Sequence, residues 1–143
     1  MEVKVKKLHE NAVIPKYSKS GDAGLDLTAT SKYFDDNGSI VYGTGLSIEI
    51  PEGFVGLLFP RSSLTNYDLS LGNHVGVVDS GYRGEILFKF KDIAVFPAVR
   101  REYQVGDRIG QLLIIPYPKI ELVESTELSD SSRGNSGYGS TGR

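Results

Sequence analysis

Apolar and polar residues alternate along several short stretches of the chain, the pattern expected of half-buried β-strands. The alternation is clear at residues 3–6, 25–27, 46–50 and 86–91, and nearly continuous apolar runs at 54–59 and 112–115 predict more deeply buried strands. Turn signals such as Asn37-Gly38 separate these stretches at intervals of about ten residues. With no long amphipathic stretch between them, we predict an antiparallel β-sandwich or β-barrel.

The stretch Gly76–Ile86, GVVDSGYRGEI, connects two of the predicted strands. Its valines lead into a glycine-containing bend, and an alternating run leads out, so we predict two strands joined by a tight connection. Asp79 and Tyr82 lie three positions apart at the bend, where both can face one concave spot. A carboxylate beside an aromatic ring there suits a small planar ligand and a polarised water. Alternatively, Asp79 only hydrogen-bonds its own turn.

Composition narrows the possible functions. A chain of 143 residues suits one domain with a core, and the absence of cysteine excludes disulfides and thiolate zinc sites. The two histidines are far apart in sequence, which argues against a histidine metal site, and a net charge of −2 argues against a broad nucleic-acid surface. With no apolar run near the roughly 18 residues of a membrane span and no signal peptide, we expect a cytoplasmic protein.

Two further segments carry charged groups in turn contexts. Asp22 and Asp26 bracket the short element at 25–27, either as site carboxylates or as turn residues at a strand entry. Arg61 precedes Ser62 and Ser63, either of which is a candidate cap for a short helix running toward Leu71. A helix start beside a fixed arginine suits an anion, and the alternative is a capped helix with a solvated arginine.

Near the C-terminus, one polar residue and one change of composition stand out. Gln111 is a neutral amide in an otherwise apolar run, so it must be hydrogen-bonded or exposed at a site. Residues 120–123 are predicted to close the folded part, which gives a single domain over residues 1–128. Residues 129–143 are rich in glycine and serine and predict a flexible arm, which either closes over a site or has no role.

Five segments together resemble the trimeric, all-β family of dUTP diphosphatases (deoxyuridine triphosphate nucleotidohydrolases), whose five motifs occur here in order. They are Asp22–Leu27, Pro60–Leu64, Gly76–Ile86, Gly106–Gln111 and Arg133–Gly142. The departures are small: Gly110 stands where the family more often has alanine, Gly81 where it often has aspartate, and Asn135-Ser136 and Tyr138 where glycine and phenylalanine are commoner.

The resemblance implies a distorted antiparallel barrel of the jelly-roll or β-clip type, with one short helix and a flexible C-terminal arm. It implies hydrolysis of dUTP to dUMP and diphosphate with Mg²⁺, which removes dUTP from the nucleotide pool and supplies the precursor of dTMP. It also implies a homotrimer with active sites shared between subunits, and no nucleic-acid or membrane partner.

The resemblance further assigns roles to individual residues. Asp79 is the expected general base for the water that attacks the α-phosphorus, Gln111 orients that water or a phosphate oxygen, and Asp26 acts on the metal from a distance. The phosphate-binding residues are Arg61, Ser62, Ser63, Gln111, Arg133, Ser140 and Thr141, and those for uracil and deoxyribose are Asn73, Gly76, Val78, Asp79, Tyr82 and Tyr138.

Two rival functions remain open on this reading. A dCTP deaminase of the related fold needs an acid–base group that reaches C4 of cytosine, and no convincing one lies near Asp79. A regulatory protein of the same fold would bind the nucleotide without releasing diphosphate. Assays of ammonia and diphosphate release separate the three.

Overall fold

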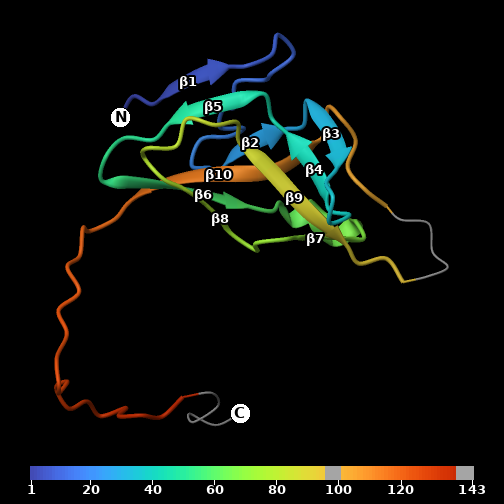
Figure 1. Ribbon diagram of the computed structural model, residues 1–143. Coiled ribbons are helices and arrows are strands. Elements are labelled where there is room, and N and C mark those ends of the chain that lie inside the picture. The colour runs from blue at the N-terminus through green and yellow to red at the C-terminus, as the bar shows by residue number, and fades with distance from the viewer. Residues whose placement is uncertain (96–100, 138–143) are drawn as a thin grey trace.

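The computed structural model describes residues 1–95 and 101–137, and nearly all of its regular structure is antiparallel β-sheet (Figure 1). A small sheet pairs β1 (Lys4–Lys7) with β5 (Leu46–Glu49). A second has the order β2 (Leu25–Thr28), β10 (Arg108–Pro116), β6 (Phe54–Phe59), β8 (Gly76–Val78). The third has the order β3 (Ser31–Phe34), β4 (Ile40–Gly43), β9 (Leu87–Asp92), β7 (Leu69–Leu71). The predicted all-β class is confirmed, and no helix in the described segments is long and apolar enough to span a membrane.

One hydrophobic core joins the three sheets, because each alternating strand directs its apolar side chains inward. In β9, Phe88 and Phe90 are 1% and 0% exposed, whereas Lys89 between them faces solvent. Tyr103 lies against Phe90, with ring centroids 5.7 Å apart, and its carbonyl accepts a hydrogen bond from the buried Tyr42 hydroxyl. The buried tyrosines therefore keep their polar atoms paired inside the core.

The predicted Asn37-Gly38 turn joins β3 to β4. Gly38 has a φ of 75°, a left-handed conformation that glycine adopts without steric cost. The Asp35 carboxylate accepts hydrogen bonds from the amides of Asn37 and Ser39 at 3.0 and 2.9 Å, so the turn is closed by its own side chain.

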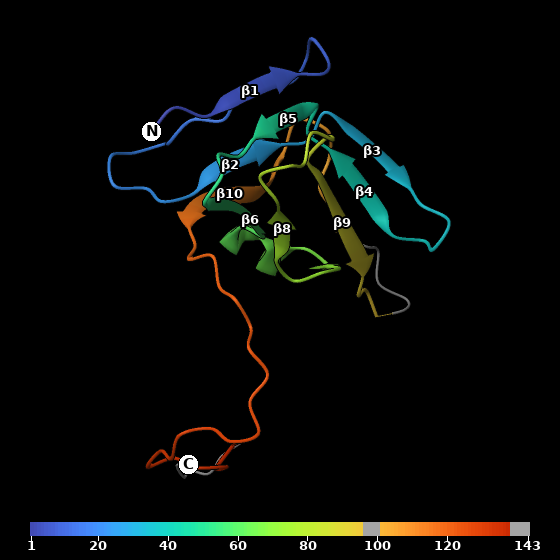
Figure 2. The same cartoon turned by 60° about the vertical axis from the view of Figure 1, so that its left-hand side comes forward.

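The connection around Asp79 differs from the prediction. The strands on either side of it form but do not pair with each other: β8 pairs with β6, whereas β9 pairs with β4 and β7 in another sheet. The hairpin interpretation is therefore wrong, and residues 79–86 cross from one sheet to the other (Figure 2). Alternation identifies a strand, but it does not identify the neighbour of that strand.

The short helix after Pro60 also differs from the prediction. It is a 3₁₀-helix, η1 (Ser62–Asn66), and the chain then extends into β7 instead of continuing helically to Leu71. Arg61 occupies the position before the helix and makes no capping hydrogen bond through its side chain, so neither serine caps it. One turn of 3₁₀-helix has little of the dipole that a longer helix offers an anion.

The chain leaves the barrel after Tyr117, whose amide donates to the Gly53 carbonyl at 3.0 Å. Both views show residues 118–137 extending away from the sheets (Figures 1 and 2). Ile120, Leu122 and Val123 are 71%, 90% and 79% exposed, so the prediction that residues 120–123 pack into the folded part is wrong for the single chain. Their apolar pattern remains without a packing partner within the described parts of the chain.

Position 110 has no room for a side chain, because the Phe88 ring lies against Gly110. A Cβ at position 110 would collide with the Phe88 ring, which is buried in the core. We predict that Gly110→Ala lowers the free energy of unfolding by about 1–3 kcal/mol through overpacking, and that adding Phe88→Leu recovers part of the loss. Denaturant unfolding of both single variants and the double variant measures this coupling. Strictly additive effects would contradict it, and Gly81→Ala, a site with open space around it, is the matched control.

Candidate functional site

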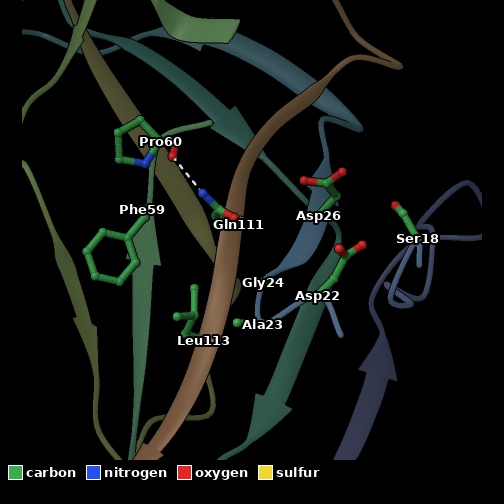
Figure 3. Close-up of a pocket in the computed structure, with 9 residues that line it drawn as sticks. All are labelled: Ser18, Asp22, Ala23, Gly24, Asp26, Phe59, Pro60, Gln111 and Leu113. Carbon is green, nitrogen blue, oxygen red and sulfur yellow. Dashed lines mark hydrogen bonds between the residues drawn. The ribbon is translucent and has the colours of Figure 1, made fainter. Parts of the chain in front are cut away.

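A hollow beside the motif residues lies where β2, β6 and β10 meet, and Figure 3 shows its lining side chains. Its volume is about 560 Å³. It forms because β10 runs between the other two strands, so that Gln111 pairs with Asp26 on one side and with Phe59 on the other. The lining residues are Ser18, Asp22, Ala23, Gly24, Asp26, Phe59, Pro60, Gln111 and Leu113.

Asp26 holds two arginines at the edge of this pocket. Its Oδ1 accepts a hydrogen bond from Arg61 Nε at 2.8 Å, and its Oδ2 accepts one from an Arg108 guanidinium nitrogen at 3.1 Å. The Asp26 and Arg61 side chains are 20% and 24% exposed, so their ion pair is partly shielded from water. Arg61 also donates to the Ser63 hydroxyl at 3.3 Å. Two cations are thus fixed beside one concave surface, an arrangement suited to an anionic ligand.

Arg108 has no role predictable from strand alternation, because a β-bulge changes the direction of its side chain. Arg108 and Gln111 are three positions apart, so on a regular strand they would point to opposite faces. The ladder between β10 and β2 shifts register between Arg108 and Gly110, which adds one residue to β10. Arg108 and Gln111 therefore both reach the side of Asp26. The alternation of apolar and polar residues does not reveal a bulge, so it does not predict that Arg108 lies beside Asp26.

Gln111 satisfies both expectations raised by its position in an apolar run. Its Nε2 donates to the Pro60 carbonyl at 3.1 Å, and the side chain lines the pocket. The opposite end of the amide lies against Gly24, where any Cβ would collide with Oε1. Gly24 therefore provides the space that the Gln111 amide occupies.

In the loop that follows Arg61, the Ser63 hydroxyl oxygen lies 3.5 Å from the Tyr103 hydroxyl oxygen. Burial raises the pKa of the Tyr103 hydroxyl, an effect that the Ser63 hydrogen bond opposes, so the phenol stays neutral at pH 7. The Tyr103 ring packs against Tyr67, with centroids 4.1 Å apart. The loop that carries Arg61 thus rests on the aromatic part of the core.

A second hollow, of about 180 Å³, brings together four of the residues expected around a nucleoside: Asn73, Gly76, Val78 and Tyr82. Asp79 does not line it. The Asp79 carbonyl accepts the Tyr82 amide at 3.0 Å, but the Asp79 side chain is exposed and borders a neighbouring hollow with Phe54 and Tyr117. The prediction that Asp79 and Tyr82 face one concave spot is therefore wrong for the single chain.

The single chain also keeps Asp79 apart from Gln111. Val78 pairs with Gly56 of β6, whereas Gln111 pairs with Phe59, three residues further along the same strand. That offset corresponds to about 10 Å along the sheet. In one copy of the chain, the Asp79 carboxylate therefore lies near one end of β6, and the pocket with Arg61 and Arg108 at its edge lies near the other.

Two further predicted residues in the described parts of the chain, Ser62 and Arg133, lie outside both hollows. Ser62 is exposed on η1. Arg133 lies on the extended tail, where its Nε donates to the Ser136 carbonyl at 3.0 Å. Tyr138, Ser140 and Thr141 lie outside the described residues. Within the described segments, no group of three or more histidine, aspartate or glutamate side chains is arranged to hold a metal ion.

Comparison with known proteins gives a consistent result. The dUTPase family model matches residues 10–142. A deoxyuridine 5'-triphosphate nucleotidohydrolase of Crocosphaera subtropica is 38% identical, with 99% of each chain covered. One of Rhodococcus erythropolis is 41% identical, covering 99% of this chain and 87% of the relative.

Solved structures agree with the sequence matches. A Staphylococcus bacteriophage 80alpha dUTPase with dUPNHPP has a TM-score of 0.84 at 30% identity, with 99% of each chain covered. A dUTPase from phage phi11 of S. aureus, solved with a structural Mg(II) ion, has a TM-score of 0.75 at 27% identity, covering 89% of this chain and 98% of that one.

Gly24 and Gln111 provide a test of the pocket geometry. In Gly24→Ala the new methyl group must displace the Gln111 amide, which breaks the bond to Pro60. Because the displaced atoms are at the end of a flexible side chain, we predict a loss of only about 1 kcal/mol in unfolding free energy. The side-chain amide signals of Gln111 should shift in NMR spectra. Unchanged signals would contradict the packing described, and Gly81→Ala again serves as the control.

Proposed function

Because the chain belongs to the dUTPase family, we propose that it hydrolyses dUTP to dUMP and diphosphate. The observation that carries the proposal is the meeting of three motifs around one pocket: Asp26, Arg61 and Gln111 come from separate segments and lie in contact with it or at its edge. We place this activity in the cytoplasm, where it removes dUTP and supplies the precursor of dTMP.

The two arginines at the edge of the first pocket, Arg61 and Arg108, suit a triphosphate. Such a group carries close to four negative charges, which repel an attacking water, and fixed guanidinium groups offset that charge without reorganising. Arg61 is fixed by Asp26, and Ser63 lies beside it as a hydroxyl donor. Ser62, on the exposed face of η1, and the tail residues Arg133, Tyr138, Ser140 and Thr141 would complete the enclosure from outside the pocket.

The residues present also suit Mg²⁺, an ion that prefers oxygen ligands and retains several waters. Asp22 and Asp26 supply carboxylate oxygens at the pocket, and both Asp26 oxygens are already hydrogen-bonded to arginines. These carboxylates would hold the waters of a metal that enters with the phosphates. When bound, Mg²⁺ supplies further neutralisation of the phosphate charge.

The second hollow suits uracil and deoxyribose. The backbone of β8 and the Asn73 side chain offer donors and acceptors for the polar edge of uracil, and a base of opposite polarity would leave buried groups unpaired. Tyr82, whose hydroxyl is held by the Glu85 carbonyl at 2.9 Å, would lie under the sugar and reject a 2′-hydroxyl. Asp79, next to this hollow, would take the proton of the attacking water, and Gln111 would orient that water.

These roles require more than one copy of the chain, because Asp79 and Gln111 lie at different ends of β6. The outward face of the sheet supports self-association. Val77, Leu57 and Leu113 form a row across β8, β6 and β10, with Val77 65% exposed. We therefore propose a homotrimer with shared sites. In each site, one subunit supplies the bend at Asp79, another supplies the pocket with Arg61 at its edge, and a third supplies the C-terminal arm.

A diphosphate-release assay with dUTP, UTP, dTTP and dCTP, with and without a chelator, tests the activity. We expect that only dUTP is hydrolysed and that the chelator abolishes this activity.

Asp79→Asn should lower turnover by about 10²- to 10⁴-fold while nucleotide binding persists, because only the general base is removed. Wild-type turnover in this variant would exclude Asp79 as the base, and ammonia release from dCTP would favour a deaminase.

Mixed assemblies test whether the sites are shared. Asp79→Asn and Gln111→Ala chains should each be nearly inactive alone. After unfolding and refolding together in equal amounts, about a quarter of the sites should recover, because each site then draws its Asp79 and its Gln111 independently from different copies. No recovery would show that both residues act from the same chain. Refolded wild-type protein controls for losses during the procedure.

A further inference from the structure

We infer that Arg83 and Glu49 position the bend that carries Asp79, so that the small β1–β5 sheet acts as a support for the general base. This inference rests on the proposed function of Asp79. The geometry points to it because residues 79–86 cross between two sheets and have no strand ladder of their own to fix them. Something else must satisfy and hold their backbone.

Arg83 provides much of that fixation from within the bend. Its guanidinium folds back toward the bend, and Nη1 donates to the carbonyls of Ser80 and Tyr82 at 2.6 and 2.9 Å. Both carbonyls belong to the turn of residues 79–82, which is closed by the hydrogen bond from the Tyr82 amide to the Asp79 carbonyl. A guanidinium holds five donors in a rigid planar fork, so two carbonyls and a carboxylate can be bound from different nitrogens, whereas a lysine has its three donors on one flexible nitrogen.

Two residues of β5 contact Arg83, one at its guanidinium group and one at its backbone carbonyl. Glu49 Oε1 lies 3.6 Å from Arg83 Nη2, and the buried Ser47 hydroxyl donates to the Arg83 carbonyl at 2.7 Å. Further along the crossing, the buried Thr44 hydroxyl donates to the Ile86 carbonyl at 2.8 Å. The second half of the crossing segment, residues 83–86, is therefore bound to the segment 44–49, and Arg83 links it to the turn at Asp79.

The Arg83–Glu49 pair has little to contribute to global stability. The two side chains are 53% and 45% exposed, and ion pairs at that exposure stabilise proteins only weakly. Its effect is local, on where the bend places the carboxylate of Asp79. Catalytic groups are sensitive to displacement, and an error of about 1 Å can lower a rate by about 100-fold.

The test compares Arg83→Met and Arg83→Lys with Lys4→Met. Lys4 also faces Glu49, at 4.0 Å, but its ammonium contacts the carboxylate rather than the bend, so its loss matches the charge change. We expect kcat for dUTP to fall about tenfold or more in Arg83→Met and less in Arg83→Lys, and to stay within about twofold in Lys4→Met. Because β8 remains paired with β6, KM should change less than kcat.

Hydrogen exchange of the Tyr82 amide, which donates to Asp79, provides a readout that does not depend on activity. It should exchange faster in Arg83→Met, with core amides and the melting temperature nearly unchanged. Equal exchange in Arg83→Met and wild type, or wild-type kcat with faster exchange, would overturn the inference. If wild-type protein releases no diphosphate from dUTP, the proposed function fails, and the exchange rates alone decide whether Arg83 holds the bend.

Should Arg83→Met fail to fold, Glu49→Gln provides a second route, since it keeps the shape of the partner and removes its charge. Faster exchange of the Tyr82 amide together with a lower kcat would support the positioning role. Wild-type values of both would overturn it.

Discussion

The ladder between β10 and its two neighbours determines where every part of the candidate site can lie. Gln111 of β10 pairs with Asp26 of β2 and with Phe59 of β6, so the phosphate-side residues are brought together by backbone hydrogen bonds. The same strand β6 pairs with β8 three residues away, which places Asp79 at a distance from Gln111. Backbone register thus keeps Asp79 and Gln111 apart within one chain, and the proposed association of subunits would bring them together.

The arginines at the edge of the first pocket are partly neutralised before any ligand binds. Asp26 neutralises part of the charge of Arg61 and Arg108 while fixing both, at the cost of some attraction for an anion. The gain is geometric, because a guanidinium that is already oriented loses little side-chain entropy on binding. Gln111 is held in the same way by Pro60, so the polar groups around this pocket are largely preorganised.

Much of the fold and site follows from local sequence, and the failures have a common physical cause. Alternation located β5 and β9 correctly, and Asn37-Gly38 located the turn between β3 and β4, because these signals depend only on neighbouring residues. The pairing of β8 with β6, the bulge that turns Arg108 toward Asp26, and the exposure of residues 120–123 depend on distant or external partners. These features cannot be predicted from a short stretch of sequence, because the residues that cause them lie elsewhere in the chain or outside it.

The position of β10 in its sheet has a consequence for biosynthesis. It is the last strand to be made, yet it lies between β2 and β6, as Figure 1 shows. Until the ribosome has released residues 108–116, both of those earlier strands keep an open edge where another chain can add. The barrel can therefore close only after residues 108–116 have emerged, and until then the open edges of β2 and β6 expose the nascent chain to edge-to-edge aggregation.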